Sequence, residues 1–312
     1  MRALTLHPRL PSKGFFLGLI LLLGGPTSAL AQDPISATDA AKPADAAPDT
    51  SISAPTRSQV QELSLERLLP ATQQRRLDIG EQAFLGLFLP AAQPEPWGGI
   101  ILIADQNEHA DWPNLIGPGR RQLSAAGWHT LAISLPEPDG PDLALDEEQR
   151  QARAKQYQEQ TLARIQAARQ VLIAEGGEQK NLPIVLLGRG EGAFWALSAA
   201  TQTTQAGEPL AALVLQNLGH IEQGETTTSQ LLEQWPGPTY DILTSRNESG
   251  EARRLQARRL GHAQYRQLMW PQGDSSDLQQ QMLIKRLDGW LQRTLTQSPA
   301  TESPISESPD GA

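Results

Sequence analysis

The sequence predicts an α/β domain with one mainly parallel sheet and helices on both of its faces. Short apolar runs of strand length alternate with helix-length segments whose apolar residues recur every three or four positions. This alternation spans residues 58–295, a length that can build a hydrophobic core without crosslinks, and the chain contains no cysteine. An ordinary core must therefore stabilise the domain.

Eight segments are predicted as strands, because apolar and β-branched residues gather in them between turn residues. The first two are joined by Gly80 and Glu81, so they should form an antiparallel hairpin at one edge of the sheet. Most of the others are separated by helix-length segments and should run parallel. In chain order, the predicted strands are residues 75–79, 83–89, 99–104, 129–135, 184–187, 211–216, 239–243 and 265–269.

Four segments are predicted as helices. Residues 147–174 follow Asp146, which forms a capping-box pattern with Gln149, and residues 114–126 lie between a proline and a glycine. A third helix begins at residue 191 or 192, and a fourth spans residues 278–295. The residues expected to face the sheet are Leu162, Ile165, Ala168 and Leu172 in the first helix and Met282, Leu283, Leu287, Trp290 and Leu291 in the last.

The two ends of the chain differ in composition from this domain. Residues 1–31 have the pattern of a cleavable signal peptide, with a basic start, the apolar run Phe15–Leu23 and a small-residue cleavage pattern. Residues 32–57 are rich in Ala, Pro and Asp, and residues 296–312 in Ser, Pro and Glu, so both are predicted to be disordered. The protein is expected to be periplasmic or secreted, with no membrane insertion after cleavage.

The composition argues against several classes of function. The formal net charge of −9 disfavours nucleic acid or an anionic membrane as the main partner. We predict no metal and no cofactor, because thiolates are absent and the polar cluster around His109 is too dense and irregular for a known ligand spacing. The partner is expected to be a small molecule or an envelope protein. A run of arginines is interpreted as a solvated or salt-bridged helix surface: Arg253, Arg254, Arg258 and Arg259.

The most informative motif is the glycine-rich turn Gly188-Arg189-Gly190-Glu191-Gly192, between a buried strand and a helix. A dinucleotide-binding turn would need an acid at the end of the next strand, where Gln216 and Asn217 stand. A purely structural interpretation is that the glycines let the strand turn sharply and the helix pack closely. The same order of strand, Gly-x-nucleophile-x-Gly and helix is also that of a nucleophile elbow.

Over residues 63–295 this turn and three further segments resemble an exported bacterial α/β-hydrolase-like family of unknown function. The further segments are residues 84–90, residues 105–113 and Gly127-Trp128-His129. The resemblance implies an α/β-hydrolase fold with a nucleophile at the turn, an acid after a later strand and a histidine after the last strand.

The chain departs from that pattern at the catalytic positions. Gly190 stands where the nucleophile belongs and has no side chain to attack a substrate. Asn247 or Glu248 could supply the acid, but residues 270–276, where the histidine should follow, contain none. The resemblance therefore implies a member that lacks the usual catalytic triad.

Other polar residues are expected at the same end of the sheet as the turn. His109 is a candidate general base that activates water in place of a serine, with Asp111 or Asp105 fixing its tautomer. The simpler interpretation of this loop is a solvated segment that caps the next helix. Glu191 is a third catalytic candidate, although an acid at a helix start is stabilised by the helix dipole without any function. The candidate ligand-binding residues are Asp105, His109, Arg189, Gly190 and Glu191.

Three functions follow as hypotheses. The leading one is an exported, catalytically degenerate α/β-hydrolase-fold protein that binds a ligand or an envelope partner in the pocket above the sheet. The second is an envelope ester or amide hydrolase with a non-serine mechanism that uses His109 and an acid. The third is an assembly factor whose disordered segment lets the domain reach partners at a distance.

Overall fold

The computed structural model describes residues 55–138, 140, 144–177, 181–219, 222–223, 226–271 and 277–297. The predicted signal peptide and nearly all of the two terminal segments predicted to be disordered lie outside the described residues. No helix among the described residues is long and apolar enough to cross a membrane.

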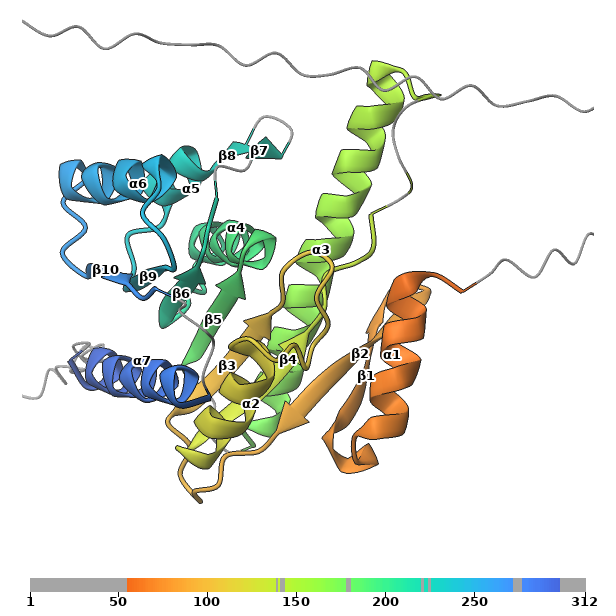
Figure 1. Ribbon diagram of the computed structural model, residues 1–312, viewed down its shortest axis with the longest axis horizontal. Coiled ribbons are helices and arrows are strands. Elements are labelled where there is room, and N and C mark those ends of the chain that lie inside the picture. The colour runs from red at the N-terminus through yellow and green to blue at the C-terminus, as the bar shows by residue number, and fades with distance from the viewer. Residues whose placement is uncertain are drawn as a thin grey trace, which may run out of the picture. The chain divides into compact units, whose positions relative to one another are not determined.

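An eight-stranded sheet forms the centre of the domain (Figure 1). The spatial order of the strands is β1-β2-β4-β3-β5-β6-β9-β10, and all pairs are parallel except β1 with β2 and β2 with β4. The eight predicted strands are confirmed to within two residues at each end. Their bounds are β1 Gln74–Ile79, β2 Gln82–Leu89, β3 Gly98–Ile103, β4 Trp128–Ile133, β5 Ile184–Arg189, β6 Ala212–Gln216, β9 Thr239–Leu243 and β10 Tyr265–Met269.

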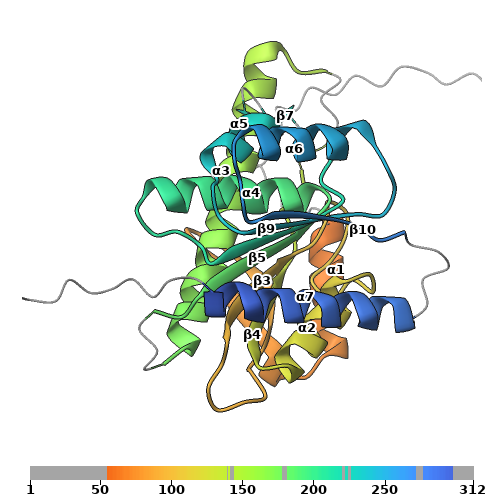
Figure 2. The same ribbon diagram turned by 90° about the vertical axis from the view of Figure 1, so that its left-hand side faces the viewer.

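Helices cover both faces of the sheet, as predicted. Figure 2 shows α2 (Ile116–Ala125) and α7 (Asp277–Gln297) on one face, and α4 (Glu191–Gln205) and α6 (Glu248–Arg259) on the other. The long helix α3 (Glu147–Glu175) packs on the α4 face, and its N-terminal turns extend beyond the sheet (Figure 1). The remaining elements are α1 Arg57–Leu68, the 3₁₀ turn Ala71–Gln73, α5 Thr228–Gln234, β7 Glu222–Gln223 and β8 Thr226–Thr227.

Most predicted helix features are confirmed. The capping box at the start of α3 is present, and the backbone N–H of Gln149 donates a hydrogen bond to the Asp146 carboxylate at 2.8 Å. In α7 the prediction was wrong for Met282, which is 47% exposed, whereas Ile284 is buried. The buried residues Leu283, Ile284, Leu287 and Leu291 define a helix face that leaves Met282 outside. Helix α7 also extends to Gln297, two residues beyond the predicted end.

One buried charge cluster corrects the interpretation of the arginine run. Arg253 is only 4% exposed, and its guanidinium forms a two-pronged contact with the fully buried carboxylate of Asp241 at 3.1 and 3.2 Å. Arg254, Arg258 and Arg259 are exposed, as predicted. Arg253 therefore connects α6 to β9 inside the domain and does not belong to the surface.

Candidate functional site

The glycine-rich turn has an unusual backbone geometry. β5 ends at Arg189 and α4 begins at Glu191, so Gly190 alone makes the turn, with φ of +53° and ψ of −119°. This combination lies outside the left-handed helical region that other residues occasionally adopt. The Gly190 amide N–H donates to the Gln216 carbonyl of neighbouring β6 at 2.8 Å, which fixes the turn to the sheet.

The carboxylate of Asp105 fills the space above this turn. Asp105 follows β3, and a Cβ atom placed on Gly190 would lie 2.0 Å from its Oδ2 and 2.3 Å from its Oδ1. Oδ1 accepts hydrogen bonds from the backbone N–H groups of Glu191 and Gln106, both at 2.8 Å. The first of these N–H groups lies at the start of α4, where anions are favoured. The protein thus places its own anion at the point from which a nucleophilic side chain would project.

Glu108 and Arg189 hold the loop of Asp105 against the turn. One oxygen of Glu108 accepts from the Asp105 amide N–H at 3.2 Å, and the other forms an ion pair with Arg189. These side chains are only 10% and 13% exposed. Burial lowers the pKa of Arg189, and the nearby charge of Asp105 opposes this shift. Arg189 was a ligand-binding candidate, and the structure places it in this internal contact with Glu108.

His109 and Asp111 do not form a base and its orienting acid. The Nδ1 atom of His109 accepts the backbone N–H of Asp111 at 3.2 Å, so the neutral ring carries its proton on Nε2. The carboxylate of Asp111 instead contacts Arg120 at 3.0 Å and Arg121 at 2.8 Å, both in α2. Arg120 is fully buried, so Asp111 compensates a buried charge. The expectation that this loop caps the next helix was wrong, because α2 starts after Leu115 without a side-chain cap and Asp111 pairs with arginines further along the helix instead.

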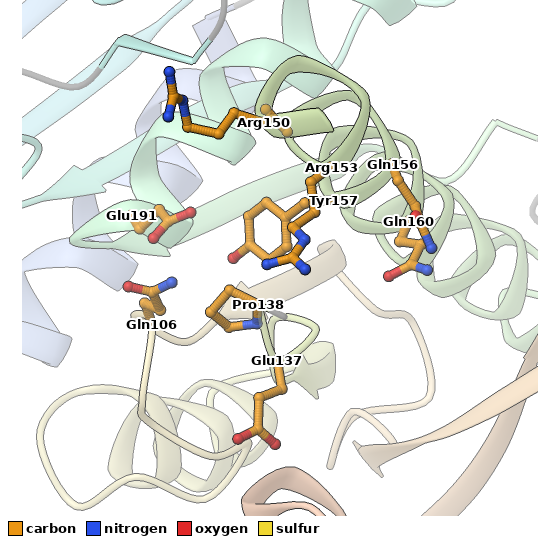
Figure 3. Close-up of a pocket in the computed structure, with 10 residues that line it drawn as sticks. Gln106, Glu137, Pro138, Arg150, Arg153, Gln156, Tyr157, Gln160 and Glu191 are labelled. Carbon is orange, nitrogen blue, oxygen red and sulfur yellow. The ribbon is translucent and has the colours of Figure 1, made fainter. Parts of the chain in front are cut away.

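An open pocket lies beside the turn, with a cavity volume of about 200 Å³. Figure 3 shows the side chains of Gln106 and Glu191 on one side and residues of the projecting part of α3 on the other, with the Tyr157 ring near the centre. The residues that line it are mostly polar: Gln106, Glu137, Pro138, Arg150, Arg153, Ala154, Gln156, Tyr157, Gln160 and Glu191. Of the predicted site residues, only Glu191 lines this pocket.

Glu191 has a fixed orientation in the pocket wall. Its Oε1 accepts the indole N–H of Trp195 at 3.0 Å, one turn further along α4. The ring of Trp195 in turn meets the Tyr157 ring edge-on at 5.9 Å between centroids. Burial raises the pKa of Tyr157, and the negative charge of Glu191 raises it further, so the phenol stays protonated. The wall of the pocket therefore holds the Glu191 carboxylate and the ring of Tyr157, whose hydroxyl is buried.

Of the two residues expected at the later acid position, Asn247 has no carboxylate and Glu248 is exposed at the surface. Asn247 caps α6 by accepting the Gly250 N–H at 2.7 Å, and Glu248 is an exposed residue of the first turn. Residues 272–276, which follow β10 and contain no histidine, lie outside the described residues. Among the described residues, no group of three or more His, Asp or Glu side chains is placed to hold a metal ion.

His109 and His129 should make the stability of the protein depend on pH, because Nδ1 of each ring accepts a hydrogen bond from a backbone N–H. Nδ1 of His129 accepts the Ala91 N–H at 3.1 Å, as His109 does for Asp111. Burial lowers the pKa of both rings, so the unfolded chain binds protons at a higher pH than the native protein. We expect the free energy of unfolding to be constant above about pH 7.5 and to fall as the pH drops through about 6.5.

Urea unfolding at pH 7.5 and pH 5.5 measures this dependence. The double variant His109→Asn/His129→Asn keeps an acceptor at each position but does not titrate, so its loss of stability between the two values should be smaller than that of the wild type. An equal loss in both proteins would show that these two histidines do not cause the pH dependence.

Comparisons with known proteins agree with this architecture. Est1E from Butyrivibrio proteoclasticus superimposes with a TM-score of 0.52 at 10% identity, covering 72% of this chain and 99% of that one. The putative dienelactone hydrolase from Klebsiella pneumoniae gives 0.51 at 12% identity, covering 70% and 96%. The dienelactone hydrolase-like promiscuous phosphotriesterase P91, from metagenomic libraries, gives 0.51 at 15% identity, covering 71% and 98%. The fold is therefore that of the α/β-hydrolase-like esterases.

Sequence comparison points to a family without an assigned activity. No curated protein matches the sequence. A family model described as "Protein of unknown function (DUF3530)" matches residues 13–156 and 142–293. Because these matches cover most of the chain, the protein belongs to the DUF3530 family.

Proposed function

We propose that this protein is an exported, catalytically degenerate α/β-hydrolase-fold protein that binds a ligand or an envelope partner through the pocket beside the glycine-rich turn. The observation that carries the proposal is the position of Asp105. Its carboxylate occupies the space of a nucleophilic side chain at residue 190 and accepts the Glu191 N–H. Export rests on the signal-peptide pattern of residues 1–31.

The arrangement opposes acyl transfer in two ways. Gly190 offers no nucleophile, and the backbone N–H after the nucleophile position is one of the two donors that stabilise the oxyanion in hydrolases with this turn. Here that N–H is bound to Asp105, and a negative carboxylate at the same place repels a developing oxyanion. His109 offers no substitute base, because its Nδ1 lone pair is bound to a backbone N–H.

The pocket has the chemistry of a binding site for a polar ligand. Its two carboxylates, Glu137 and Glu191, are matched by two guanidinium groups, Arg150 and Arg153, and amide side chains complete most of the wall. Such a lining offers many donors and acceptors but little apolar surface, so it suits a hydroxyl- or amide-rich ligand better than an acyl chain. Saccharide and peptide components of a cell envelope have this chemistry.

Ester and amide hydrolysis by the purified mature protein tests the proposal. With p-nitrophenyl acetate, p-nitrophenyl butyrate and a p-nitroanilide, we expect the wild type, His109→Ala and Gly190→Ser to release product at the same rate as buffer. A characterised esterase of the same fold serves as the positive control. Wild-type activity that disappears in His109→Ala would establish the non-serine hydrolase instead.

A binding measurement complements the assay. Neutral oligosaccharides and short peptides are screened for an increase in the melting temperature of the wild type, and Glu191→Gln serves as the matched variant. This variant removes the pocket carboxylate while keeping an oxygen that can accept from Trp195. A ligand whose stabilising effect is equal in both proteins does not bind in this pocket.

A further inference from the structure

A groove rich in arginine lies between the edge strand β10 and the C-terminal half of α7. Its cavity volume is about 480 Å³, and Arg266 of β10 and Arg286 and Arg293 of α7 line it. The rings of Tyr240 and Trp290 also line it and stack on each other, with centroids 4.9 Å apart. We call these five residues the arginine groove. The strand β10 is at the opposite end of the sheet from β1 (Figure 1), and no residue of the groove lines the pocket of Glu191.

The groove carries positive charge for which the described residues supply no counterion. No acidic residue lines it, and within the described part of the chain no side-chain partner neutralises any of its three arginines. All three are exposed, in a protein whose formal net charge is −9. Arg286, Trp290 and Arg293 recur along α7 at a spacing that places them on one helix face. Like charges so close together repel unless an anion lies between them.

The same groove borders an open sheet edge. β10 pairs only with β9, so the hydrogen-bonding groups on its other side have no partner strand among the described residues. Exposed edges of this kind favour uncontrolled association, and proteins commonly cover them with a loop or tail. An extended anionic segment would satisfy both the arginines and the edge.

The chain contains such a segment next to the groove. Gln297, the last residue of α7, is itself part of the groove lining. Residues 298–312 follow it and contain three acids, Glu302, Glu307 and Asp310, but no Lys, Arg or His. Prolines recur at positions 299, 304 and 309, a composition that favours an extended chain, and extended proline-containing segments bind grooves lined by aromatic rings.

The distances allow the contact. Arg286 lies about 16 Å along the helix axis from Gln297, because an α-helix rises about 1.5 Å per residue. An extended chain covers that distance in about five residues. Glu302, five residues after Gln297, can therefore reach both arginines of the groove that lie on α7.

From the charge, the open edge and the adjacency, we propose that the acidic segment 298–312 binds intramolecularly in the arginine groove and covers the β10 edge. The proposal is independent of the pocket beside Gly190. It assigns to this segment a docking role that a disordered tail would lack.

The absence of cysteine permits a direct test in the full-length chain. A bimane label on the single-cysteine variant Ser306→Cys is quenched when it contacts tryptophan. We expect quenching in this protein and its loss in Trp290→Phe, in Arg266→Gln/Arg293→Gln and at high salt, which screens exposed charges. Trp128, Trp195 and Trp235 are at most 1% exposed and cannot contact the label.

Matched controls separate the alternatives. Arg258→Gln/Arg259→Gln removes two exposed arginines of α6 and should leave the quenching unchanged. A label at Ser36→Cys, in the N-terminal acidic segment, should not be quenched. The proposal is overturned if the Ser306 label is not quenched, if Trp290→Phe or the Arg266/Arg293 pair leaves its quenching intact, or if the quenching grows with protein concentration, which would indicate a second copy as the partner.

Discussion

Gly190→Ala should lower the free energy of unfolding by about 2–5 kcal/mol, since two separate costs add at this position. A residue with a side chain is strained at a φ of +53° and a ψ of −119°. The new methyl group would also lie 2.0 Å from Oδ2 of Asp105, so the carboxylate would have to leave the Glu191 and Gln106 N–H groups. Urea unfolding of the wild type and the variant gives the difference.

Gly80→Ala is a control for the strain of a positive φ without any steric contact. Gly80 has a φ of +62° in the turn between β1 and β2, and a Cβ atom there would meet nothing within 4 Å. Its replacement should cost about 1–2 kcal/mol, the strain of the left-handed conformation. A Gly190→Ala variant no less stable than Gly80→Ala would show that the carboxylate of Asp105 does not fill the space above the turn.

A double-mutant cycle isolates the contact between the two residues. Asp105→Ala removes the carboxylate but leaves two backbone N–H groups without their acceptor, so it should also destabilise. In that background Gly190→Ala meets no carboxylate, and its additional cost should fall to that of the backbone strain at residue 190 alone. Additive costs would mean that the two positions are independent. Strong coupling would support the view that glycine at 190 and aspartate at 105 form one arrangement.

Much of the fold could be predicted because burial repeats with a regular period. β3, β5 and β6 lie inside the sheet with helices on both faces, so their sequences are nearly continuous apolar runs. Helix α1 was not predicted because only Leu65 is buried among its residues, which leaves no apolar stripe to recognise. Its capping box between Thr56 and Gln59 was the available signal.

The site was predictable only in outline. The glycine-rich turn and the loop after β3 were correctly paired as neighbours, because parallel strands end at the same edge of the sheet. The contact of Asp105 with residue 190 depends on the direction of a side chain in a loop. No periodic pattern in the sequence reveals that direction. The α3 wall of the pocket, around Tyr157, was missed because it consists of polar residues that resemble an ordinary solvated helix face.

The same limitation hid the ion pair between Arg253 and Asp241. In sequence, Arg253 belongs to a run of four arginines, and nothing local separates it from its neighbours. Asp241 stands within a strand of mixed residues, where a carboxylate is rare. A charged residue in the middle of a predicted core strand was the signal that a buried cation must face it, because an isolated buried charge is too costly to retain.

Arg253→Met should lower the free energy of unfolding by about 3–5 kcal/mol, because it leaves the buried carboxylate of Asp241 without its counter-charge. The Leu218 carbonyl, which accepts from Arg253 at 2.6 Å, would also lose its donor. Tyr265 at 2.5 Å and Gln267 at 3.0 Å would remain as donors to Asp241, but both are neutral and cannot compensate the charge. Chemical unfolding measures the loss.

Arg254→Met is the matched control, one residue further along the same helix. Arg254 pairs with Glu251 at the surface, where both side chains are about half exposed, so its replacement should leave stability unchanged. The double variant Arg253→Met/Asp241→Leu separates a missing charge from a missing contact. If the uncompensated carboxylate is the cause, removing it as well should recover much of the stability. If the double variant is less stable than Arg253→Met, the arginine acts mainly by filling space between α6 and the sheet, and the charge balance is secondary.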